Sequence, residues 1–222
     1  MNSKQVAGER AVEYVEEGMI IGLGSGSTAF FAIQKIAERV RQGLKIKGVC
    51  TSENTRMLAE QWNIPYVDIN DVDHIDLTID GADEIDPYGN GIKGGGGALL
   101  FEKIVASNSK QVIWVVEQKK LVDQLGAFPL PVEILPFGYK YILDILAEMG
   151  LSPSLRMSGE ETFTTDGGHF IADIQIGKIP DHWELDRNLS QIPGIIENGL
   201  FLNLVNKVVV ANEEEVEIIT FR

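Results

Sequence analysis

Carboxylates, one ammonium and four consecutive glycines are crowded into residues 80–102. Residues 80–86 read Asp-Gly-Ala-Asp-Glu-Ile-Asp, Lys93 precedes four glycines, and Glu102 follows them. Four successive glycines are costly to order, and a chain accepts this cost where its backbone must approach another group closely. Residues typical of a strand precede the segment, and a helical pattern follows it. We therefore expect a ligand site between a strand and a helix, rather than an acidic surface loop followed by a flexible linker.

The side chains in this segment have the types that acid–base chemistry on oxygen atoms needs. Asp80 and Asp83 follow a predicted strand and could hydrogen-bond hydroxyl groups or relay protons between oxygens. Lys93, an ammonium on glycine-rich backbone, could stabilise a developing oxyanion. Glu102 is a candidate general base, but the same carboxylate could lie on a helix surface and pair with Lys103. Spacing alone leaves that choice open.

The carboxylates of this segment also permit a metal site. Divalent cations prefer oxygen ligands, which the segment offers from Asp80, Asp83, Glu84 and Asp86. Lys93 follows closely, and its positive charge would repel a cation. We therefore expect no metal, and we expect Glu84 and Asp86 to occupy exposed turn or cap positions.

A second glycine-rich segment, residues 22–28, lies between a predicted strand and the helix that follows it. It reads Gly-Leu-Gly-Ser-Gly-Ser-Thr. Open α/β sheets bind ligands at this place, outside the carboxyl ends of their strands. Free N–H groups at the helix start, together with the hydroxyls of Ser25, Ser27 and Thr28, would cradle a phosphate group.

Three other interpretations compete for this segment. A dinucleotide fingerprint needs Gly-x-Gly-x-x-Gly, but Ser27 stands at the last glycine position, and the next strand runs into Thr51 and Ser52 rather than ending in an acidic residue. A nucleotide-binding P-loop needs a lysine that is absent here. The purely structural alternative is a tight turn with a serine cap. A small phosphate ester is the favoured ligand.

The composition limits the classes of function. The chain has 222 residues, 44% of them hydrophobic, which is enough for one large or two small domains. A net charge of −14 and a pI near 4.6 argue against a nucleic-acid-binding surface. They are compatible with a local anion site, because such a site needs only backbone N–H groups and one or two lysines.

Cys50 is the only cysteine, which excludes an internal disulfide and fits a reducing cytosol. It lies in a strand-like run and is expected to be a small core residue. The sequence shows no signal peptide and no long apolar span. We therefore expect a soluble, cytoplasmic protein without a membrane partner.

Strand and helix patterns alternate over the first two-thirds of the chain. A helix capped by Ser3 is predicted to run to about Glu17 and to end at Gly18. Strands separated by helical patterns are predicted at 19–23, 46–50, 75–79 and 111–116. Repeated β-α units of this kind indicate an α/β fold, with a doubly wound, mostly parallel, Rossmann-like sheet.

The pattern changes at residue 128. From there the order is strand, helix, strand, strand, helix, strand, predicted at 132–135, 139–149, 154–157, 169–175, 181–192 and 199–203. This is the ferredoxin-like arrangement, with an Asp-Gly turn between its central strands. The apolar strands at 207–211 and 216–220 are predicted to rejoin the first sheet. We therefore predict a Rossmann-like catalytic domain of residues 1–127 and 204–222, with an inserted ferredoxin-like α+β lid domain of residues 128–203.

Taken together, these motifs resemble those of the ribose-5-phosphate isomerase A family over the whole length of the chain. The matching segments are Gly-Ser-Gly-Ser-Thr at 24–28, Asp-Gly-Ala-Asp-Glu at 80–84, Lys-Gly-Gly-Gly at 93–96, Glu-Lys at 102–103 and Phe-Pro-Leu-Pro-Val-Glu at 128–133. The resemblance implies an aldose–ketose isomerase, without metal or other cofactor, that interconverts D-ribose 5-phosphate and D-ribulose 5-phosphate in the non-oxidative branch of the pentose phosphate pathway. One departure is Phe101, where some members carry a polar or basic residue.

The resemblance also implies a role for each matched residue. Glu102 is the base that moves a proton between C2 and C1 through an enediolate. Asp80 assists ring opening and proton transfer between oxygens, Asp83 orients hydroxyls, and Lys93 stabilises the enediolate. The phosphate is bound by Lys4 and by the loop of Ser25, Gly26, Ser27 and Thr28. Further substrate-binding positions are Gly81, Ala82, Gly94, Gly95, Gly96 and Lys120.

Two other classes of function fit parts of the sequence. A non-catalytic sugar-phosphate sensor would keep the phosphate loop without needing Glu102 as a base. A related-fold CoA transferase would use a carboxylate as nucleophile, and an aminosugar-phosphate deaminase usually brings a catalytic histidine that this site segment lacks. The expected partner is a small sugar phosphate, with no nucleic acid and no membrane, and the resemblance implies a homodimer or homotetramer.

Overall fold

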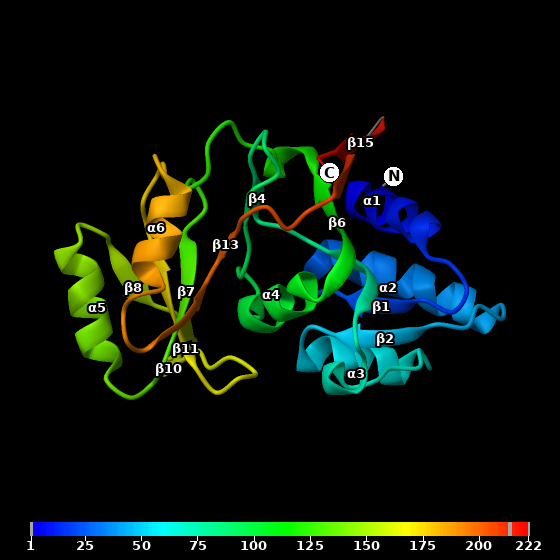
Figure 1. The fold of residues 1–222 in the computed structure, drawn as a ribbon, viewed down its shortest axis with the longest axis horizontal. Helices are drawn as coiled ribbons and strands as arrows, with labels where there is room; N and C mark the ends of the chain where they lie inside the picture. The colour runs from blue at the N-terminus through cyan, green and yellow to red at the C-terminus, as the bar shows by residue number, and fades with distance from the viewer. Residues whose placement is uncertain (1, 213–214, 222) are drawn as a thin grey trace. The chain divides into compact units, whose positions relative to one another are not determined.

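The computed structural model describes residues 2–212 and 215–221, and the chain folds into two compact units (Figure 1). The first unit consists of Met1–Ala82, Phe101–Leu121 and Asn203–Arg222, and the second of Asp83–Leu100 and Val122–Leu202. Asp80 and Glu102 thus belong to the first unit, whereas Lys93 and its glycine run belong to the second. The domain limits expected from the sequence, 1–127 with 204–222 and 128–203, stay a prediction.

The first unit is built on a six-stranded sheet in the order β15-β14-β6-β3-β1-β2. Its neighbouring strands are parallel except for β14 and β15, which are antiparallel. The strands are β1 (Ile20–Leu23), β2 (Lys47–Cys50), β3 (Ile75–Asp80), β6 (Ser109–Glu117), β14 (Lys207–Ala211) and β15 (Val216–Thr220). These observations confirm the predicted mostly parallel sheet and the predicted return of the two C-terminal strands to it.

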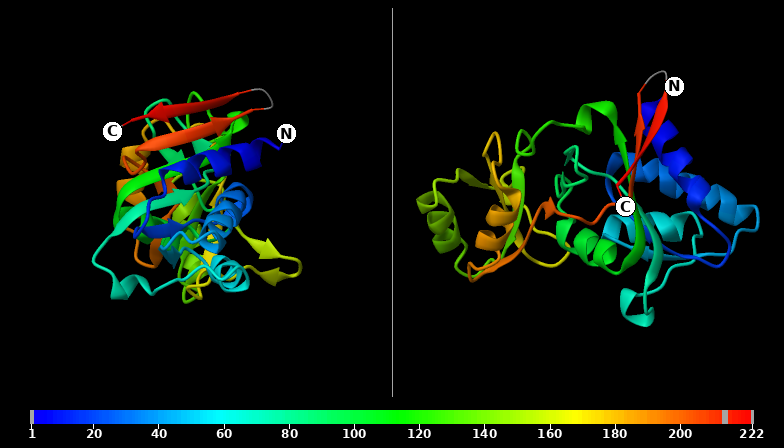
Figure 2. Two further views of the ribbon diagram at one scale, coloured as in Figure 1. Left: turned by 90° about the vertical axis from the view of Figure 1, so that its right-hand side faces the viewer. Right: turned by 45° about the horizontal axis from the view of Figure 1, so that its top comes forward.

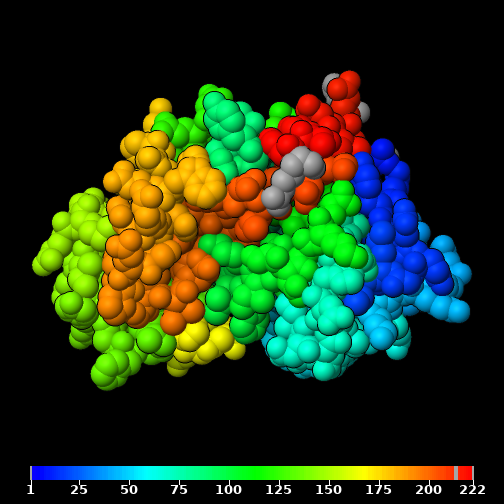
Figure 3. All heavy atoms as spheres, viewed as in Figure 1, coloured from blue at the N-terminus to red at the C-terminus, as the bar shows by residue number. Residues whose placement is uncertain are grey.

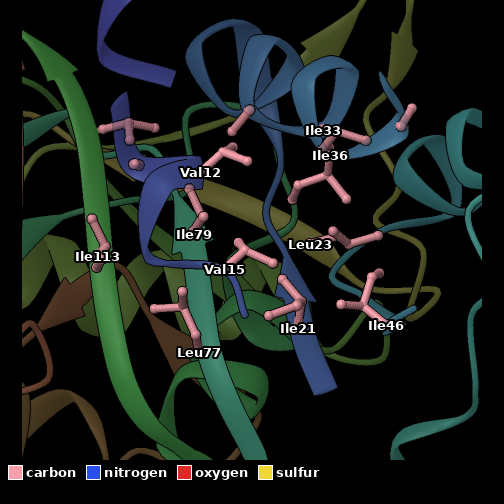
Figure 4. Close-up of a cluster of buried hydrophobic side chains, with 14 of the residues drawn as sticks. Val12, Val15, Ile21, Leu23, Ile33, Ile36, Ile46, Leu77, Ile79 and Ile113 are labelled. Carbon is pink, nitrogen blue, oxygen red and sulfur yellow. The ribbon is translucent and has the colours of Figure 1, made fainter. Parts of the chain in front are cut away.

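Helices cover this sheet and enclose its apolar side chains. They are α1 (Ser3–Ala11), α2 (Gly26–Arg41), α3 (Glu53–Gln61) and α4 (Leu99–Ser107), with the 3-10 turns η1 (Val12–Tyr14), η2 (Ile69–Asp71) and η3 (Gln118–Lys120). Figure 4 shows the core cluster in which Ile33 and Ile36 of α2 lie near Leu23 of β1. Burial of each such side chain contributes about 1.5–3 kcal/mol, which holds α2, and therefore the loop before it, against the sheet. Among the described residues, no helix is long and apolar enough to cross a membrane.

The first helix differs from its prediction at both ends. Asn2, rather than Ser3, is the N-cap, because its side chain accepts a hydrogen bond from the backbone N–H of Lys4 at 3.1 Å. The α-helix ends at Ala11, and only a 3-10 turn follows it. Figures 2 and 3 show the blue α1 segment beside the red C-terminal strands of the same unit. This packing holds α1, and with it Lys4, against the sheet.

The second unit contains a four-stranded antiparallel sheet in the order β12-β7-β11-β8. In chain order its elements are β7 (Leu130–Ile134), α5 (Tyr139–Glu148), β8 (Pro153–Leu155), β11 (Phe170–Ile174), α6 (His182–Leu189) and β12 (Ile195–Asn198). This is the predicted β-α-β-β-α-β order. The last strand was expected at 199–203 but lies before Gly199, because the residues after Gly199 pair with a different sheet.

That different sheet consists of very short strands. β4 (Glu84–Ile85), β5 (Gly91–Ile92) and β13 (Leu200–Phe201) form a three-stranded sheet in the order β13-β5-β4, and β9 (Met157–Ser158) pairs with β10 (Glu161–Thr162). Strands of two residues are too short for a periodic pattern, so the sequence did not reveal them. The three-stranded sheet fixes the backbone immediately before Lys93.

Cys50 ends β2 and is half-buried rather than a full core residue. Burial raises the pKa of its thiol to about 11, and only the thiolate reacts with alkylating agents. We predict that iodoacetamide at pH 8 labels native Cys50 at least about a hundredfold more slowly than the thiol of the urea-unfolded chain. Intact-mass spectrometry over time gives both rates. Equal rates in the native and unfolded chains would contradict the prediction.

Candidate active site

The glycine-rich turn of residues 22–28 leaves β1 at the carboxyl end of the parallel sheet. Leu23 of β1 is paired with Ile79 of β3, so the turn begins next to the end of β3. The backbone N–H of Gly24 donates to the Ile79 carbonyl at 3.0 Å. A Cβ on Gly24 would lie 2.3 Å from Asp80 Oδ1. Position 24 therefore requires glycine, because the two strand ends approach each other closely.

Asp80 ends β3 and is almost fully buried, with 2% of its surface exposed. Its Oδ1 accepts two backbone hydrogen bonds of 2.8 Å, one from Ser25 in the turn after β1 and one from Gly81. Hydrogen bonds to a charged group contribute about 1.5–3 kcal/mol each. One carboxylate therefore joins two of the predicted ligand-binding segments.

Hydroxyl groups from the next strand–helix junction support the same turn. Ser25 Oγ lies 2.7 Å from Thr51 Oγ1 and 3.0 Å from Ser52 Oγ. Thr55 Oγ1 donates to the Gly24 carbonyl at 2.9 Å, and both threonines are buried. The sequence interpretation missed this cluster, although the pattern Thr-Ser-x-x-Thr directly after a predicted strand was a usable signal. The Ser25 hydroxyl thus lies among protein hydroxyls as well as in the predicted phosphate loop.

The N-terminus of α2 presents Gly26, Ser27 and Thr28. Ser25 is the N-cap residue, with an extended backbone and no side-chain capping bond. The first N–H groups of a helix have no partner within it, and the helix dipole favours an anion there. Lys4 Nζ donates to Ser27 Oγ at 2.8 Å. A helix N-terminus and an ammonium therefore lie together, which suits an anionic group.

Glu117 holds Lys4 in this position. Its Oε2 lies 3.9 Å from Lys4 Nζ and 3.2 Å from Lys119 Nζ. Burial acts to raise the pKa of Glu117, but the hydrogen bond and charge of Lys119, the charge of Lys4 and the Ser3 hydroxyl together lower it below its ordinary value. Glu117 is therefore ionised at neutral pH and attracts Lys4. Its single negative charge faces two ammonium groups, so a net positive charge remains.

A cavity of about 610 Å³ opens at this end of α2. Its lining includes Lys4, Gly24, Gly26, Ser27 and Thr55. Small-molecule sites typically have volumes of roughly 300–1,000 Å³. The first unit thus has room for a small molecule beside the groups predicted to bind a phosphate.

In the second unit, Asp83 is joined directly to the glycine run. Asp83 Oδ2 accepts the backbone N–H of Gly95 at 2.8 Å. Gly94 and Gly97 have φ angles of +107° and +83°, which favour glycine, and the N–H of Gly97 donates to the Gly94 carbonyl at 3.0 Å. A Cβ on Gly96 would meet nothing within 4 Å. The run is therefore a defined turn with an open outer face.

Lys93 precedes this turn and is buried, with 3% of its surface exposed. Its backbone N–H donates to the Gly199 carbonyl at 2.9 Å, and its Nζ lies 5.4 Å from the centroid of the Phe201 ring. Cation–π contacts of this kind contribute about 0.5–2 kcal/mol. The ammonium is thus held away from bulk water. In these buried surroundings its charge acts more strongly than it would at the protein surface.

The expectation that Glu84 and Asp86 occupy exposed turn positions is wrong. Only 4% of Glu84 and 6% of Asp86 are exposed. Glu84 accepts backbone hydrogen bonds from Gly126 at 2.7 Å and Phe128 at 2.6 Å. Asp86 accepts the backbone and side-chain N–H groups of Asn90 at 2.9 and 3.0 Å. Both carboxylates are therefore buried and organise loops.

Among the described residues, no group of three or more His, Cys, Asp or Glu side chains is arranged to hold a metal ion.

Glu102 lies in the first turn of α4, with only 6% of its surface exposed. Its burial contradicts the alternative of a helix-surface carboxylate. The preceding residue, Phe101, is 36% exposed and lines a separate cavity of about 520 Å³ with Cys50 and Tyr66. Successive helical side chains point roughly 100° apart, so Phe101 and Glu102 face different surroundings.

The remaining predicted site residues are divided between the two units. Lys120 ends η3 and is half-buried, whereas its neighbour Lys119 is exposed and paired with Glu117. The first unit holds Lys4, Ser25, Gly26, Ser27, Thr28, Asp80, Gly81, Ala82, Glu102 and Lys120, and the second holds Asp83, Lys93, Gly94, Gly95 and Gly96. The role of each residue toward a substrate stays a prediction.

Comparison with known proteins identifies the family. The family model of ribose 5-phosphate isomerase A (phosphoriboisomerase A) matches residues 47–215. Ribose-5-phosphate isomerase A of Enterococcus faecalis is 51% identical over 216 residues, which cover 96% of each chain. A solved ribose 5-phosphate isomerase A from Methanocaldococcus jannaschii is 38% identical, with a TM-score of 0.94 over 99% of this chain and 98% of that one. A D-ribose-5-phosphate isomerase in complex with phospho-erythronic acid is 37% identical, with a TM-score of 0.95 over 99% of this chain and 100% of that one. The chain described here therefore belongs to the ribose 5-phosphate isomerase A family.

Proposed function

We propose that this chain is an aldose–ketose isomerase that interconverts D-ribose 5-phosphate and D-ribulose 5-phosphate. Membership of the family supports this reaction, and one solved relative binds a phosphorylated sugar acid. The observation that carries the proposal is the burial of Glu102, of which only 6% is exposed. Taking a carboxylate out of water is costly. Loop organisation accounts for that cost at Glu84 and Asp86, and the role of general base accounts for it at Glu102.

The phosphate group is proposed to bind at the start of α2. Lys4 Nζ and Ser27 Oγ lie 2.8 Å apart beside the helix N-terminus, and the cavity there has a volume of about 610 Å³. Thr28 lies in the first turn of the same helix. A phosphate that is remote from the reacting carbons provides binding energy in the ground state and the transition state alike.

Glu102 is proposed to transfer the proton between the two carbons. In the open-chain aldose it takes the proton from C2, which leaves an enediolate, and then returns the proton to C1. A second proton moves from O2 to O1, so the C1 carbonyl becomes a hydroxyl and the C2 hydroxyl becomes a carbonyl. No atom or electron enters or leaves, and the reaction needs no redox cofactor.

Three further residues are proposed to handle the oxygen atoms. Asp80 assists ring opening and the proton transfer between O1 and O2, since the hydrogen bonds of Ser25 and Gly81 to its Oδ1 orient the carboxylate. Asp83 orients substrate hydroxyls. Lys93 supplies positive charge to the enediolate oxygen, and a charge that is already in position loses little energy to reorganisation.

The alternative functions explain less of the site. A sugar-phosphate sensor accounts for the loop before α2 but not for two buried ionisable groups, Glu102 and Lys93. A CoA transferase or an aminosugar-phosphate deaminase would have to belong to a different family. We also propose a cytoplasmic location, which the single cysteine of the chain favours. As the resemblance implies, we propose a homodimer or homotetramer, and light scattering during gel filtration would distinguish the two.

We predict that Glu102→Gln folds normally and loses about 10²–10⁴-fold in kcat, because the amide cannot accept the C2 proton. The assay follows ribulose 5-phosphate formation from ribose 5-phosphate, and thermal melting checks the fold. Glu148→Gln, at an exposed position of α5, is the matched control and should keep the wild-type rate. Turnover of Glu102→Gln within a few-fold of wild type would remove Glu102 from the mechanism.

Lys4→Ala and Thr28→Ala are predicted to raise KM more than they lower kcat, because they remove uniform binding of a remote phosphate. Initial rates over a range of ribose 5-phosphate concentrations separate the two constants. Lys45→Ala removes an exposed lysine of the same unit and should change neither. A loss of kcat at unchanged KM would place Lys4 and Thr28 outside the phosphate site.

Activity is predicted to need no metal ion, because Lys93 can supply the positive charge that a cation would bring to the enediolate. Full activity should survive exhaustive dialysis against EDTA, measured in metal-free buffer. Loss on chelation, followed by recovery with magnesium or manganese, would overturn both this prediction and the role of Lys93.

A further inference from the structure

Arg156 is the most completely engaged arginine side chain of the second unit. It lies between β8 and β9. Its guanidinium donates two hydrogen bonds to Asp173 of β11, from Nε to Oδ2 at 2.8 Å and from Nη2 to Oδ1. Its remaining terminal nitrogen, Nη1, donates to the carbonyls of Gly94 at 2.8 Å and Gly95 at 3.2 Å. An ordinary surface ion pair would leave that nitrogen in water.

The position of this guanidinium is fixed by its surroundings. The Arg156 backbone N–H donates to the Ile171 carbonyl at 2.8 Å, and its carbonyl accepts the N–H of Phe163 at 2.9 Å. The guanidinium lies 5.8 Å from the centroid of the Phe163 ring. Only 14% of the Arg156 side chain and 19% of the Asp173 side chain are exposed. The pair is therefore a rigid, largely desolvated attachment point.

One peptide group of the glycine run is held at both ends. The carbonyl of Gly94 accepts from Arg156, and the N–H of the same peptide, on Gly95, donates to Asp83 Oδ2 at 2.8 Å. Because a peptide group is planar, fixing the direction of its carbonyl also fixes the direction of its N–H. Arg156 thus sets the direction of the hydrogen bond that Asp83 receives.

Phe163 adds a second restraint on the same turn. Its ring packs so closely on Gly97 that a Cβ added to this glycine would lie 2.4 Å from Phe163 Cζ. The turn between Gly94 and Gly97 is therefore covered on one side by the Arg156–Phe163 pair, and Gly95 and Gly96 are exposed. A run of glycines has no side chains with which to define its own conformation, so these outside contacts have to supply the definition.

We propose that Arg156 is a positioning residue for the reaction: with Asp173 it orients the Gly94–Gly95 peptide, and through it Asp83 and the backbone after Lys93. The inference rests on the proposed function, because it depends on the roles proposed there for Asp83 and Lys93. It assigns Arg156 itself no contact with substrate. It extends that function by making the geometry of the glycine run depend on an ion pair 62 residues away along the chain. A lysine cannot replace this arginine, because an ammonium lacks the planar fork that reaches a carboxylate and two carbonyls at once.

The test compares Arg156→Met and Arg156→Lys with Arg187→Met, which removes an exposed arginine of α6 in the same unit. We expect both Arg156 variants to lose at least about tenfold in kcat for ribose 5-phosphate, because small displacements of positioning groups have large effects on rate. Competitive inhibition by inorganic phosphate should be unchanged, since the phosphate loop belongs to the first unit. Methylguanidinium should restore part of the activity to Arg156→Ala. Arg187→Met should match the wild type.

Hydrogen exchange gives a readout that does not depend on catalysis. In the wild-type protein the Gly95 amide should be protected, and in Arg156→Lys exchange should accelerate in the peptide that contains residues 93–97, with the rest of the protein unchanged. An unprotected Gly95 amide in the wild type would overturn the proposal, as would a wild-type kcat in Arg156→Met. A loss of activity with a parallel loss of phosphate binding and melting temperature would show a merely structural role. If the wild-type chain lacked isomerase activity, the proposed function would fail instead, and the exchange result would still test the hold on the turn.

Discussion

Asp80 Oδ1 accepts hydrogen bonds from the backbone N–H groups of Ser25 and Gly81. The arrangement of the loops at the carboxyl end of the sheet in the first unit depends on this interaction. The parallel pairing of β1 and β3 brings the two strand ends together, but it does not specify how the chain leaves them. The carboxylate supplies that specification, since it can accept from both segments only if each turns its N–H inward. The missing side chain of Gly24 makes the approach possible, because a Cβ there would overlap Asp80. The start of α2, with the N–H groups proposed to bind phosphate, and its contact with Lys4 come directly after this turn.

Backbone N–H groups also explain how an acidic chain buries so many carboxylates. The buried Glu84 and Asp86, and the partly exposed Asp83, each accept at least one backbone hydrogen bond within the second unit. Such bonds compensate for part of the hydration that a carboxylate loses on burial. The carboxylates of residues 80–86 therefore organise loops, in addition to the catalytic roles proposed for Asp80 and Asp83. A cluster of acidic residues in a sequence does not distinguish these uses, because the donors lie on distant loops, as Gly126 and Phe128 do for Glu84.

Local patterns were sufficient to predict much of this structure from the sequence. The alternation of strands and helices, the ferredoxin-like order and the two glycine-rich turns all depend on residues close together along the chain, and the structure contains each of them. The features that were missed depend on partners far apart. Examples are the pairing of β13 with β5, the hydroxyl cluster around Ser25, and the hydrogen bonds of Arg156 to the glycine run. The strands β4 and β5 lie close together along the chain and were missed because two residues are too few for a periodic pattern. The cap at Asn2 was missed for a different reason, since Ser3 beside it is an equally good capping residue by type.

The net charge of −14 acts on an anionic substrate at long range, whereas the groups proposed to bind the substrate act at contact distance. At physiological ionic strength the field of the whole molecule is screened beyond about 8 Å, so it affects mainly the rate of approach. The proposed phosphate contact involves Lys4 and the start of α2, and Lys4 Nζ lies within hydrogen-bond distance of Ser27 Oγ there. Glu117 lies 3.9 Å from Lys4, so its negative charge lowers the positive potential around the ammonium, but it also restricts where that ammonium can lie. A lysine that is already positioned loses less conformational entropy when the substrate arrives. The local arrangement of a few groups, rather than the sum of charges, therefore determines whether this acidic protein can hold a phosphate.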